Sequence, residues 1–308
     1  MKPHRRQFLD LAPEYTDFEK AAVSILPFPY EGGISYRGGT AGAPDAVLEA
    51  SANLELYDEV LREEPYRMGI VTIHPPDIPP QAGDVLEQVY RTTRSLMKAG
   101  KFVVLLGGDH SITPGCFRAV QERYANASVI QLDAHADLRD AYDGSRFSHA
   151  CTMARIRDIC KDTLQLGIRS LSKEEAERID AEDIHLYTID DCRHGKFDID
   201  TTLGCLTDPV YVTVDVDVFD WSVIMSTGTP EPGGFTWEEG LSLLHQIFLR
   251  KNVVGFDVVE LAHNDNDYNS PFAVAKLIYK MLGFKLEHVL SEKNLPWPSA
   301  PMGTILPS

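Results

Sequence analysis

Two kinds of hydrophobic pattern alternate along the chain. Short, nearly continuous apolar runs are typical of strands buried on both faces, whereas apolar residues that recur every three to four positions are typical of helices with one buried face. The strand pattern is found at Ala21–Leu26, Met68–Ile73, Phe102–Leu106, Ser128–Leu132, Thr163–Ile168, His185–Ile189, Pro209–Val218 and Val253–Val259. The helical pattern is found at Ala43–Leu61, Val85–Ala99, Pro114–Tyr124, Cys151–Ile159, Lys173–Ala181, Thr236–Lys251 and Pro271–Phe284.

This alternation predicts an α/β fold in which a largely parallel sheet carries helices on both faces. We find no internal repeat and no low-complexity linker. We therefore expect a single domain over residues 1–308, with its core at about 21–285 and irregular extensions at both ends. In open parallel sheets, functional residues gather beyond the carboxyl ends of the strands. The residues that follow the predicted strands are therefore the first candidates for a functional site.

The charge of the chain narrows the range of possible partners. Its 29 basic and 46 acidic residues give a net charge of −17 at pH 7. Such a chain repels nucleic-acid phosphates and anionic lipids, and it favours metal ions and small cations. It has no apolar run of about 18 residues, which argues against a transmembrane helix. Five scattered cysteines without C-x-x-C spacing indicate reduced thiols, so we expect a cytoplasmic protein.

Acidic and imidazole side chains follow or end four of the predicted strands. They are His110, Asp133, His135, Asp137, Asp215, Asp217 and Glu260. Side chains in an extended segment alternate between two faces. The alternate polar residues at 133–137 and at 215–217 are therefore each expected to project to one side, toward a common site.

The charges of this set match two divalent cations. Burying several carboxylates together without cations would cost many kcal/mol and raise their pKa values. The four aspartates supply four negative charges, and His110 and His135 supply neutral donors. Imidazole and carboxylate ligands without thiolate fit Mn²⁺, with iron, cobalt, nickel or zinc as alternatives. Two such ions can activate a water near neutral pH for attack on an electrophilic carbon.

The order of these motifs resembles that of the arginase/agmatinase ureohydrolase family. The motifs are Gly-Gly-Asp-His-Ser at 107–111, Asp-Ala-His-Ala-Asp at 133–137 and Asp-Val-Asp at 215–217. Ser-His-Ala at 148–150 and the segment from Ser226 to Gly234 are similar to the agmatinase branch. The resemblance implies a three-layer α/β/α fold around an eight-stranded parallel sheet and a centre of two Mn²⁺ ions per chain. It also implies hydrolysis of a guanidino group to urea and an amine, in a homotrimer or homohexamer.

The resemblance also implies a role for each candidate residue. It implies that Glu260 grips the guanidinium and that His149 transfers protons. Asp109 directly precedes a ligand, and we expect it to orient that ligand without binding the metal itself. One ion would be held by His110, Asp133, Asp137 and Asp215. The other would be held by Asp133, His135, Asp215 and Asp217, with Asp133 and Asp215 shared between the two.

The loop Leu138–Phe147 bears on the substrate. It lacks the Asn/Ser pattern with which arginases hold an α-carboxylate. Its Asp140 and Asp143 would suit an amine tail, and its Arg139 and Arg146 would suit a carboxylate tail. We expect hydrolysis of agmatine to urea and putrescine. The alternatives are N1-aminopropylagmatine, guanidinobutyrate, guanidinopropionate and arginine.

Two interpretations from other classes remain open. A mononuclear metal deacetylase of related fold would share some of the Asp and His chemistry, but it gives no reason for the Asp215 and Asp217 pair. A catalytically inactive, metal-stabilised partner protein would require a missing ligand, and none is missing. Glu260 is followed by Leu-Ala-His-Asn-Asp-Asn-Asp, whereas Ser-Pro-Pro often follows this glutamate in agmatinases. This departure leaves the length of the substrate open.

Overall fold

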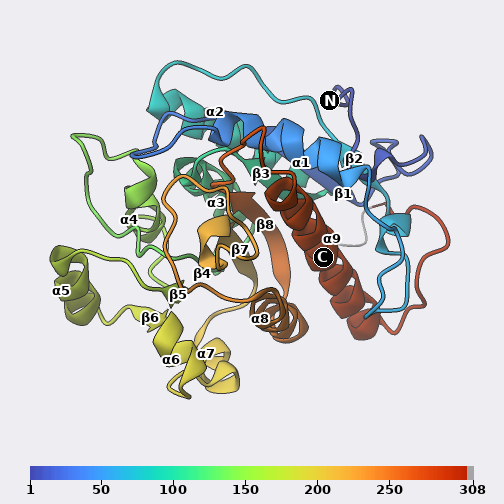
Figure 1. Cartoon of the computed structure of the whole chain (residues 1–308). Helices are drawn as coiled ribbons and strands as arrows, with labels where there is room; N and C mark the ends of the chain where they lie inside the picture. Colours follow the sequence, from blue (N-terminus) through green and yellow to red (C-terminus); the bar gives the residue numbers. More distant parts are fainter. Residues whose placement is uncertain (304–308) are drawn as a thin grey trace.

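The computed structural model describes residues 1–303 of the chain, and these contain eight strands and nine α-helices (Figure 1). The strands are β1 (Val23–Phe28), β2 (Ile70–Thr72), β3 (Phe102–Gly107), β4 (Ser128–Leu132), β5 (Thr163–Ile168), β6 (His185–Thr188), β7 (Val210–Asp215) and β8 (Val253–Val259). The helices are α1 (Ala43–Ser51), α2 (Ala82–Lys98), α3 (Thr113–Arg123), α4 (Thr152–Arg157), α5 (Lys173–Glu182), α6 (Ile189–Arg193), α7 (Ile199–Cys205), α8 (Trp237–Arg250) and α9 (Asn269–Lys293). All eight predicted strand segments are confirmed.

The strands form one parallel sheet in the order β2-β1-β3-β8-β7-β4-β5-β6. The chain fills one side of the sheet with β1 to β3, crosses to β4, β5 and β6, and returns to place β7 and β8 in the gap. The four central strands β3, β8, β7 and β4 are thus neighbours in space, although they are far apart in sequence. Because they are parallel, their carboxyl ends meet at one edge.

Helices cover both faces of the sheet, as the alternating pattern predicts. Side chains of β3 show the two layers: Phe102 and Val104 belong to one apolar cluster, and Val103 and Leu105 belong to the other. Helices α1, α7, α8 and α9 pack into the first cluster, and α2, α3 and α4 pack into the second. The result is the predicted three-layer α/β/α arrangement.

Helix α1 is shorter than the helix predicted over Ala43–Leu61. It ends at Ser51, whose hydroxyl donates to the Leu48 carbonyl and accepts the Leu9 N–H at 2.9 Å. The chain then forms turns around the buried Asp58, which pairs with Lys280 of α9 at 3.0 Å. The apolar residues after Ser51 therefore pack as a loop and not as further helical turns.

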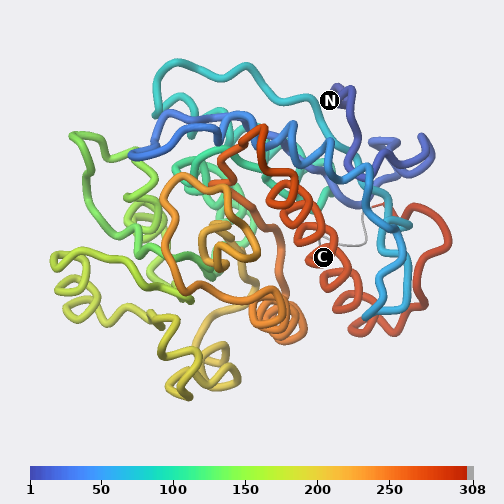
Figure 2. The backbone as a smooth tube through the Cα atoms, viewed as in Figure 1, coloured from blue at the N-terminus to red at the C-terminus, as the bar shows by residue number. Residues whose placement is uncertain are grey.

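Helix α9 is longer than the predicted helix, which ended at Phe284. It continues to Lys293 and lies beside α1 and α8, so that the two ends of the sequence share one layer (Figure 2). Two short helices, α6 and α7, were not predicted; each begins after a capping side chain, Thr188 and Asp198 respectively. No helix within residues 1–303 is long and apolar enough to cross a membrane.

Candidate active site

The edge where the central strands end collects the candidate side chains. His110 opens a 3-10 turn after β3, Asp133 follows β4, Asp215 ends β7, and Glu260 follows β8. All four are almost completely buried. Asp217 comes from the 3-10 turn Val216–Val218 that continues β7. The order of strands in the sheet therefore brings the predicted set together.

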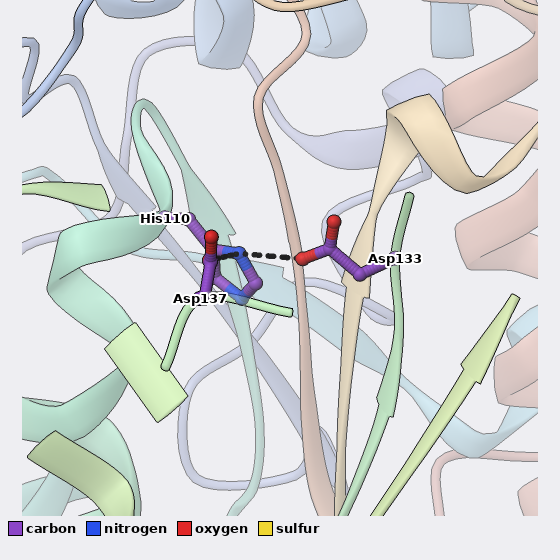
Figure 3. A group of neighbouring side chains, drawn as sticks. All are labelled: His110, Asp133 and Asp137. Atoms are coloured by element: carbon purple, nitrogen blue, oxygen red, sulfur yellow. Dashed lines mark ion pairs between the residues drawn. The ribbon is translucent and has the colours of Figure 1, made fainter. Parts of the chain in front are cut away.

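A first group of donor atoms surrounds the His110 ring (Figure 3). Its Nδ1 lies 3.2 Å from Asp133 Oδ2, 3.2 Å from Asp137 Oδ2 and 3.4 Å from Asp215 Oδ2. Three carboxylates thus converge on a single nitrogen. Ligand atoms about 3 Å apart fit around one ion, since metal–ligand bonds to nitrogen and oxygen are about 2.1 Å long.

A second group surrounds the His135 ring. Its Nδ1 lies 2.9 Å from Asp217 Oδ2 and 3.6 Å from Asp133 Oδ1. Asp133 therefore turns one oxygen toward each histidine and is common to both groups. Asp215 is different, because its second oxygen, Oδ1, accepts the Asp217 N–H at 3.0 Å.

Turns place these side chains, whereas alternation along an extended segment was predicted to place them; that local prediction was wrong. β4 ends at Leu132, and Asp137 adopts a left-handed conformation with φ of 52°. β7 ends at Asp215, and the following 3-10 turn carries Asp217. The carboxylates also hold these turns: Asp133 Oδ1 accepts the His135 N–H at 2.6 Å.

Burial and mutual repulsion raise the pKa values of three aspartates. Burial, followed by the charge of Asp133, raises the pKa of Asp137 to about 6. Burial, followed by neighbouring carboxylates, raises the pKa of Asp215 well above its usual range. Burial also raises the pKa of Asp217. For Asp133, burial is outweighed by the two histidines, which hold its pKa below the usual range. Without cations, the cluster therefore retains protons.

The histidines share those protons. Burial alone would lower the pKa of His135, but the charge of Asp217 and contacts with Asp133 raise it to about 12. His110 shows the same balance, and its carboxylate neighbours raise its pKa well above 6.5. His110 Nδ1 and Asp217 Oδ2 are buried without a hydrogen-bond partner. Two donor groups with unsatisfied buried atoms fit a pair of divalent cations, which would replace the protons.

Three further buried residues fix the orientation of the His110 ring. Its Nε2 lies 2.8 Å from Thr213 Oγ1, and the Thr213 hydroxyl donates to Asp257 Oδ1 at 2.5 Å. Tyr211 donates to the other Asp257 oxygen at 2.7 Å. This series of hydrogen bonds keeps a proton on His110 Nε2 and turns Nδ1 toward the carboxylates. No sequence motif marks these residues, and the one available signal was Asp257, an acid inside an otherwise apolar strand.

Asp109 binds the backbone around His110. Its carboxylate accepts the Ser111 N–H at 3.0 Å and caps the turn that begins with His110. It also accepts the Gly33 N–H at 2.8 Å. The Gly33 carbonyl in turn accepts the His149 N–H at 3.0 Å. Asp109 thus links the backbone of His110 to that of His149.

Glu260 and His149 lie beside the donor groups and contact each other. Glu260 Oε1 accepts the His110 N–H at 2.7 Å and lies 3.3 Å from His149 Nδ1. Its Oε2 is buried without a partner. His149 Nε2 lies 2.8 Å from Ser35 Oγ, a contact that no motif predicted. Burial lowers the pKa of His149, but Glu260 outweighs it and raises the pKa to about 9.

A cavity of about 170 Å³ opens onto both donor groups. It is lined by Ser35, His135, Asp137, Arg139, Tyr142, His149, Ala150, Asp215 and Thr229. The candidate proton-transfer residue and side chains from both donor groups thus share one concave wall. Such a cavity is the expected position of a small substrate.

The charged residues of the 138–147 loop take different positions relative to the cavity. Asp140 accepts from Arg155 at 2.6 Å and from Arg146 at 3.4 Å at the surface. Neither Asp140 nor Asp143 is among the residues of the cavity wall, and a role for either of them with an amine tail stays a prediction. Arg146 pairs with Asp140 and Asp158 and is not among the residues of the cavity wall. Arg139 is the charged residue of this loop that lines the cavity.

Sequence and structure comparisons agree with this geometry. The model of the arginase family matches residues 21–283. The chain belongs to the arginase family. It is 39% identical to an N(1)-aminopropylagmatine ureohydrolase of Synechocystis sp., over 91% of this chain and 94% of that protein. It is 31% identical to an agmatinase of Pyrococcus horikoshii, over 89% of this chain and 95% of that protein.

The fold is shared with solved members of the family. An agmatine ureohydrolase of Thermoplasma volcanium superposes with a TM-score of 0.84 at 26% identity, over 95% of this chain and 97% of that chain. The arginase-like eight-stranded fold is therefore confirmed. Membership makes the chain an amidinohydrolase that acts on small guanidino compounds, which excludes the deacetylase interpretation.

Proposed function

We propose that the chain is a ureohydrolase that uses two Mn²⁺ ions. His110, Asp133, Asp137 and Asp215 would hold one ion. Asp133, His135, Asp215 and Asp217 would hold the other. The observation that carries this proposal is the pair of buried donor groups that share Asp133, next to Glu260 with an unpartnered oxygen. When bound, two divalent ions would supply Lewis acidity and an activated water as nucleophile.

Glu260 would hold the guanidinium of the substrate. Its Oε1 is anchored by the His110 N–H, and its Oε2 is buried and free to accept an N–H. A carboxylate and a planar guanidinium form paired charge-assisted hydrogen bonds. An anchored carboxylate next to the two donor groups would present the guanidinium carbon to the nucleophile.

His149 would supply the proton that the leaving amine needs. It lines the cavity, and its two ring nitrogens face Glu260 and Ser35. The contact with Glu260 favours the protonated ring, as a general acid requires. Ser35 would keep the ring oriented while the proton leaves.

For the substrate we propose N1-aminopropylagmatine, which would give urea and spermidine. The support is the name of the Synechocystis relative, which is 39% identical over 91% of this chain. Agmatine, which would give urea and putrescine, is the second candidate, since the Pyrococcus and Thermoplasma relatives carry that name. Both substrates place a positive charge, and no carboxylate, beyond the guanidino group.

One assay tests the activity and the substrate together. The Mn²⁺-loaded enzyme is incubated with N1-aminopropylagmatine, agmatine, guanidinobutyrate, guanidinopropionate and arginine, and urea is measured. Bound manganese per chain is counted in the same preparation. We expect urea from the first two compounds and two ions per chain. Absence of urea from every compound would contradict the proposed reaction, and a single ion would contradict the proposed centre.

We also propose a homotrimer or homohexamer of single-domain subunits. The support is the resemblance to a family of closed oligomers. Light scattering coupled to size-exclusion chromatography tests it, and a monomeric mass at micromolar concentration would contradict it.

A further inference from the structure

Arg169 binds backbone carbonyls from several segments around the second donor group. It follows β5 directly, and its main-chain N–H donates to the Ala134 carbonyl at 2.8 Å. The guanidinium makes four further bonds, all to carbonyl oxygens. Its Nη2 donates to Asp217 at 2.5 Å and to Glu231 at 2.8 Å, its Nε donates to Pro232 at 3.0 Å, and its Nη1 donates to Gly167 at 3.3 Å.

These bonds connect the two sides of the second donor group. Ala134 precedes His135, and Asp217 provides the carboxylate that faces the His135 ring. The turn at 230–234 carries Glu231, whose Oε1 lies 3.8 Å from His135 Nε2. Arg169 therefore binds the backbone on both sides of the His135–Asp217 contact and holds the turn that faces the far side of the ring.

The guanidinium occupies an unusual position for a charged group. Arg169 is half-buried, the acceptors of its guanidinium among residues 1–303 are carbonyl oxygens, and burial lowers its pKa from the usual value. Even a partly buried charge without a paired carboxylate is costly unless its hydrogen bonds are satisfied. The charges of Asp217 and Asp133 act on it through space. An arginine with five donors in a fixed fork is suited to such a set of carbonyls, whereas lysine is not.

We propose that Arg169 is a positioning residue for the second metal, holding Asp217 and His135 at their binding distance. This inference rests on the proposed two-metal function. Loss of Arg169 should therefore weaken the binding of an ion at His135 and leave the binding of an ion at His110 unchanged. The first group has its own support, because Thr213 and Asp257 hold the His110 ring independently of Arg169.

The charge of Arg169 has an opposing effect. A cation near the site repels a metal ion, so removal of the charge alone would strengthen metal binding. Removal of the hydrogen bonds frees the backbone of Asp217 and the turn at 230–234. Outer-shell partners of metal ligands typically contribute about 10- to 100-fold in affinity. We therefore expect the misplacement of Asp217 and His135 to lower the metal affinity by more than the loss of the Arg169 charge raises it.

Three variants separate these effects. Arg169→Met removes both the charge and the hydrogen bonds. Arg169→Lys keeps the charge but lacks the planar set of N–H donors that binds the carbonyls. Arg193→Met is the matched control. Arg193 also donates to the turn, at the carbonyls of Gly233 (3.2 Å) and Gly234 (2.8 Å), but it has no bond to either donor group. Each purified, folded protein is titrated with Mn²⁺, and bound manganese is measured. Electron paramagnetic resonance detects the spin-coupled signal that two neighbouring Mn²⁺ ions give. Circular dichroism checks the fold.

We expect two ions in the wild type and in Arg193→Met. Both Arg169 variants should bind the second ion about 10- to 100-fold more weakly and lose the spin-coupled signal, with the first ion retained. Wild-type affinity in both Arg169 variants, or tighter binding in Arg169→Met, would overturn the inference. Equal loss in Arg193→Met would also overturn it, because the turn alone would then be responsible. Fewer than two ions in the wild type would overturn the proposed centre itself.

Discussion

Glu260 adopts a backbone conformation that is rare for residues other than glycine. Its φ is 65°, in the left-handed region, which costs an L-residue about 1–2 kcal/mol. The Glu260 N–H donates to the Gly108 carbonyl at 2.9 Å, and its Oε1 accepts the His110 N–H. These bonds join the ends of β8 and β3 and hold the side chain toward the donor groups. Strain of this kind is found at sites where geometry serves function.

Glu260→Gln is expected to abolish turnover and leave the metal content near that of the wild type. The amide keeps the size of the side chain but loses the charge that would balance the guanidinium. We expect a loss of several kcal/mol in transition-state stabilisation, measured as kcat/KM for urea release. Manganese per chain is the control, because Glu260 contacts the main chain of His110 and not its ring nitrogen. A variant without manganese would assign Glu260 to the metal ligands.

His149→Asn is expected to reduce kcat by about 10²- to 10⁴-fold, the range for one proton-transfer group. The pKa of His149 is raised to about 9, so the ring loses its proton as the pH rises through that value. Bound cations would lower the pKa, which places the alkaline decline of the wild type at or below about pH 9. The pH profile of the variant should lack this decline. An unchanged alkaline decline would exclude His149 as its source.

At the scale of elements, the order of strands explains why the site assembles. Alternating patterns and buried runs predicted every strand, and the polar residues after four of them predicted the members of the cluster. The order β3-β8-β7-β4 was not predictable from the chain, because each strand reads as apolar on both faces. The local turns were not predicted either. Asp137 adopts a left-handed backbone and Asp217 lies in a 3-10 turn, and neither conformation produces a periodic pattern of apolar residues in the sequence.

Long-range partners were equally hidden from the sequence. Thr213 and Asp257 lie on different strands, and only the pairing of β7 with β8 makes them neighbours. Arg169 follows β5 without any motif around it. Asp140 was a candidate partner for an amine tail, and in the structure Arg155 on α4 binds it at the surface. In each case the decisive contact joins segments whose distance in space is set by the complete fold.

The β7–β8 contact leads to a prediction for the first donor group. Thr213→Val removes the hydroxyl between His110 and Asp257 with little change in volume. The ring is then free to turn or change tautomer, and we expect about 10- to 100-fold weaker binding of the ion at His110. Titration with Mn²⁺ measures this affinity. Thr213→Ser, which keeps the hydroxyl, is the matched control and should bind like the wild type; equal losses in both variants would implicate the methyl group instead.

At the scale of the whole molecule, metal ions and protons compete for the same buried ligand atoms. The metal-free cluster holds protons on His110, on His135 and, below about pH 6, on Asp137. Metal binding must displace them, so affinity falls as the pH falls. We expect manganese occupancy at limiting Mn²⁺ to be high at pH 8 and to decline steeply below pH 6, with urea release declining in parallel. Activity that persisted after exhaustive chelation would contradict a metal-dependent reaction.

The charge around the cavity leads to a prediction about the tail of the substrate. Arg139 lines the cavity, with its Nε 3.7 Å from Glu175 Oε2 and its guanidinium beside the Tyr142 ring. Glu175 offsets much of this charge, so a cationic tail is tolerated. The α-carboxylate of arginine would need several partners to replace its water, and Arg139 is the single arginine or lysine among the described residues of the cavity wall. We expect kcat/KM for N1-aminopropylagmatine and agmatine to exceed that for arginine by about tenfold or more.

A variant of Arg139 measures how strongly the charge of the cavity wall selects between substrates with a cationic tail and substrates with a carboxylate tail. Removal of its charge in Arg139→Ala should raise kcat/KM for the two cationic substrates by up to about fivefold, since partly exposed charge pairs contribute at most about 1 kcal/mol. The same variant should lower kcat/KM for guanidinobutyrate. Arg146→Ala is the matched control on the same loop, because Arg146 pairs with Asp140 and Asp158 away from the cavity, and it should change neither value. If guanidinobutyrate were the preferred substrate of the wild type and Arg139→Ala removed that preference, Arg139 would be a carboxylate-binding residue and the natural substrate an acid.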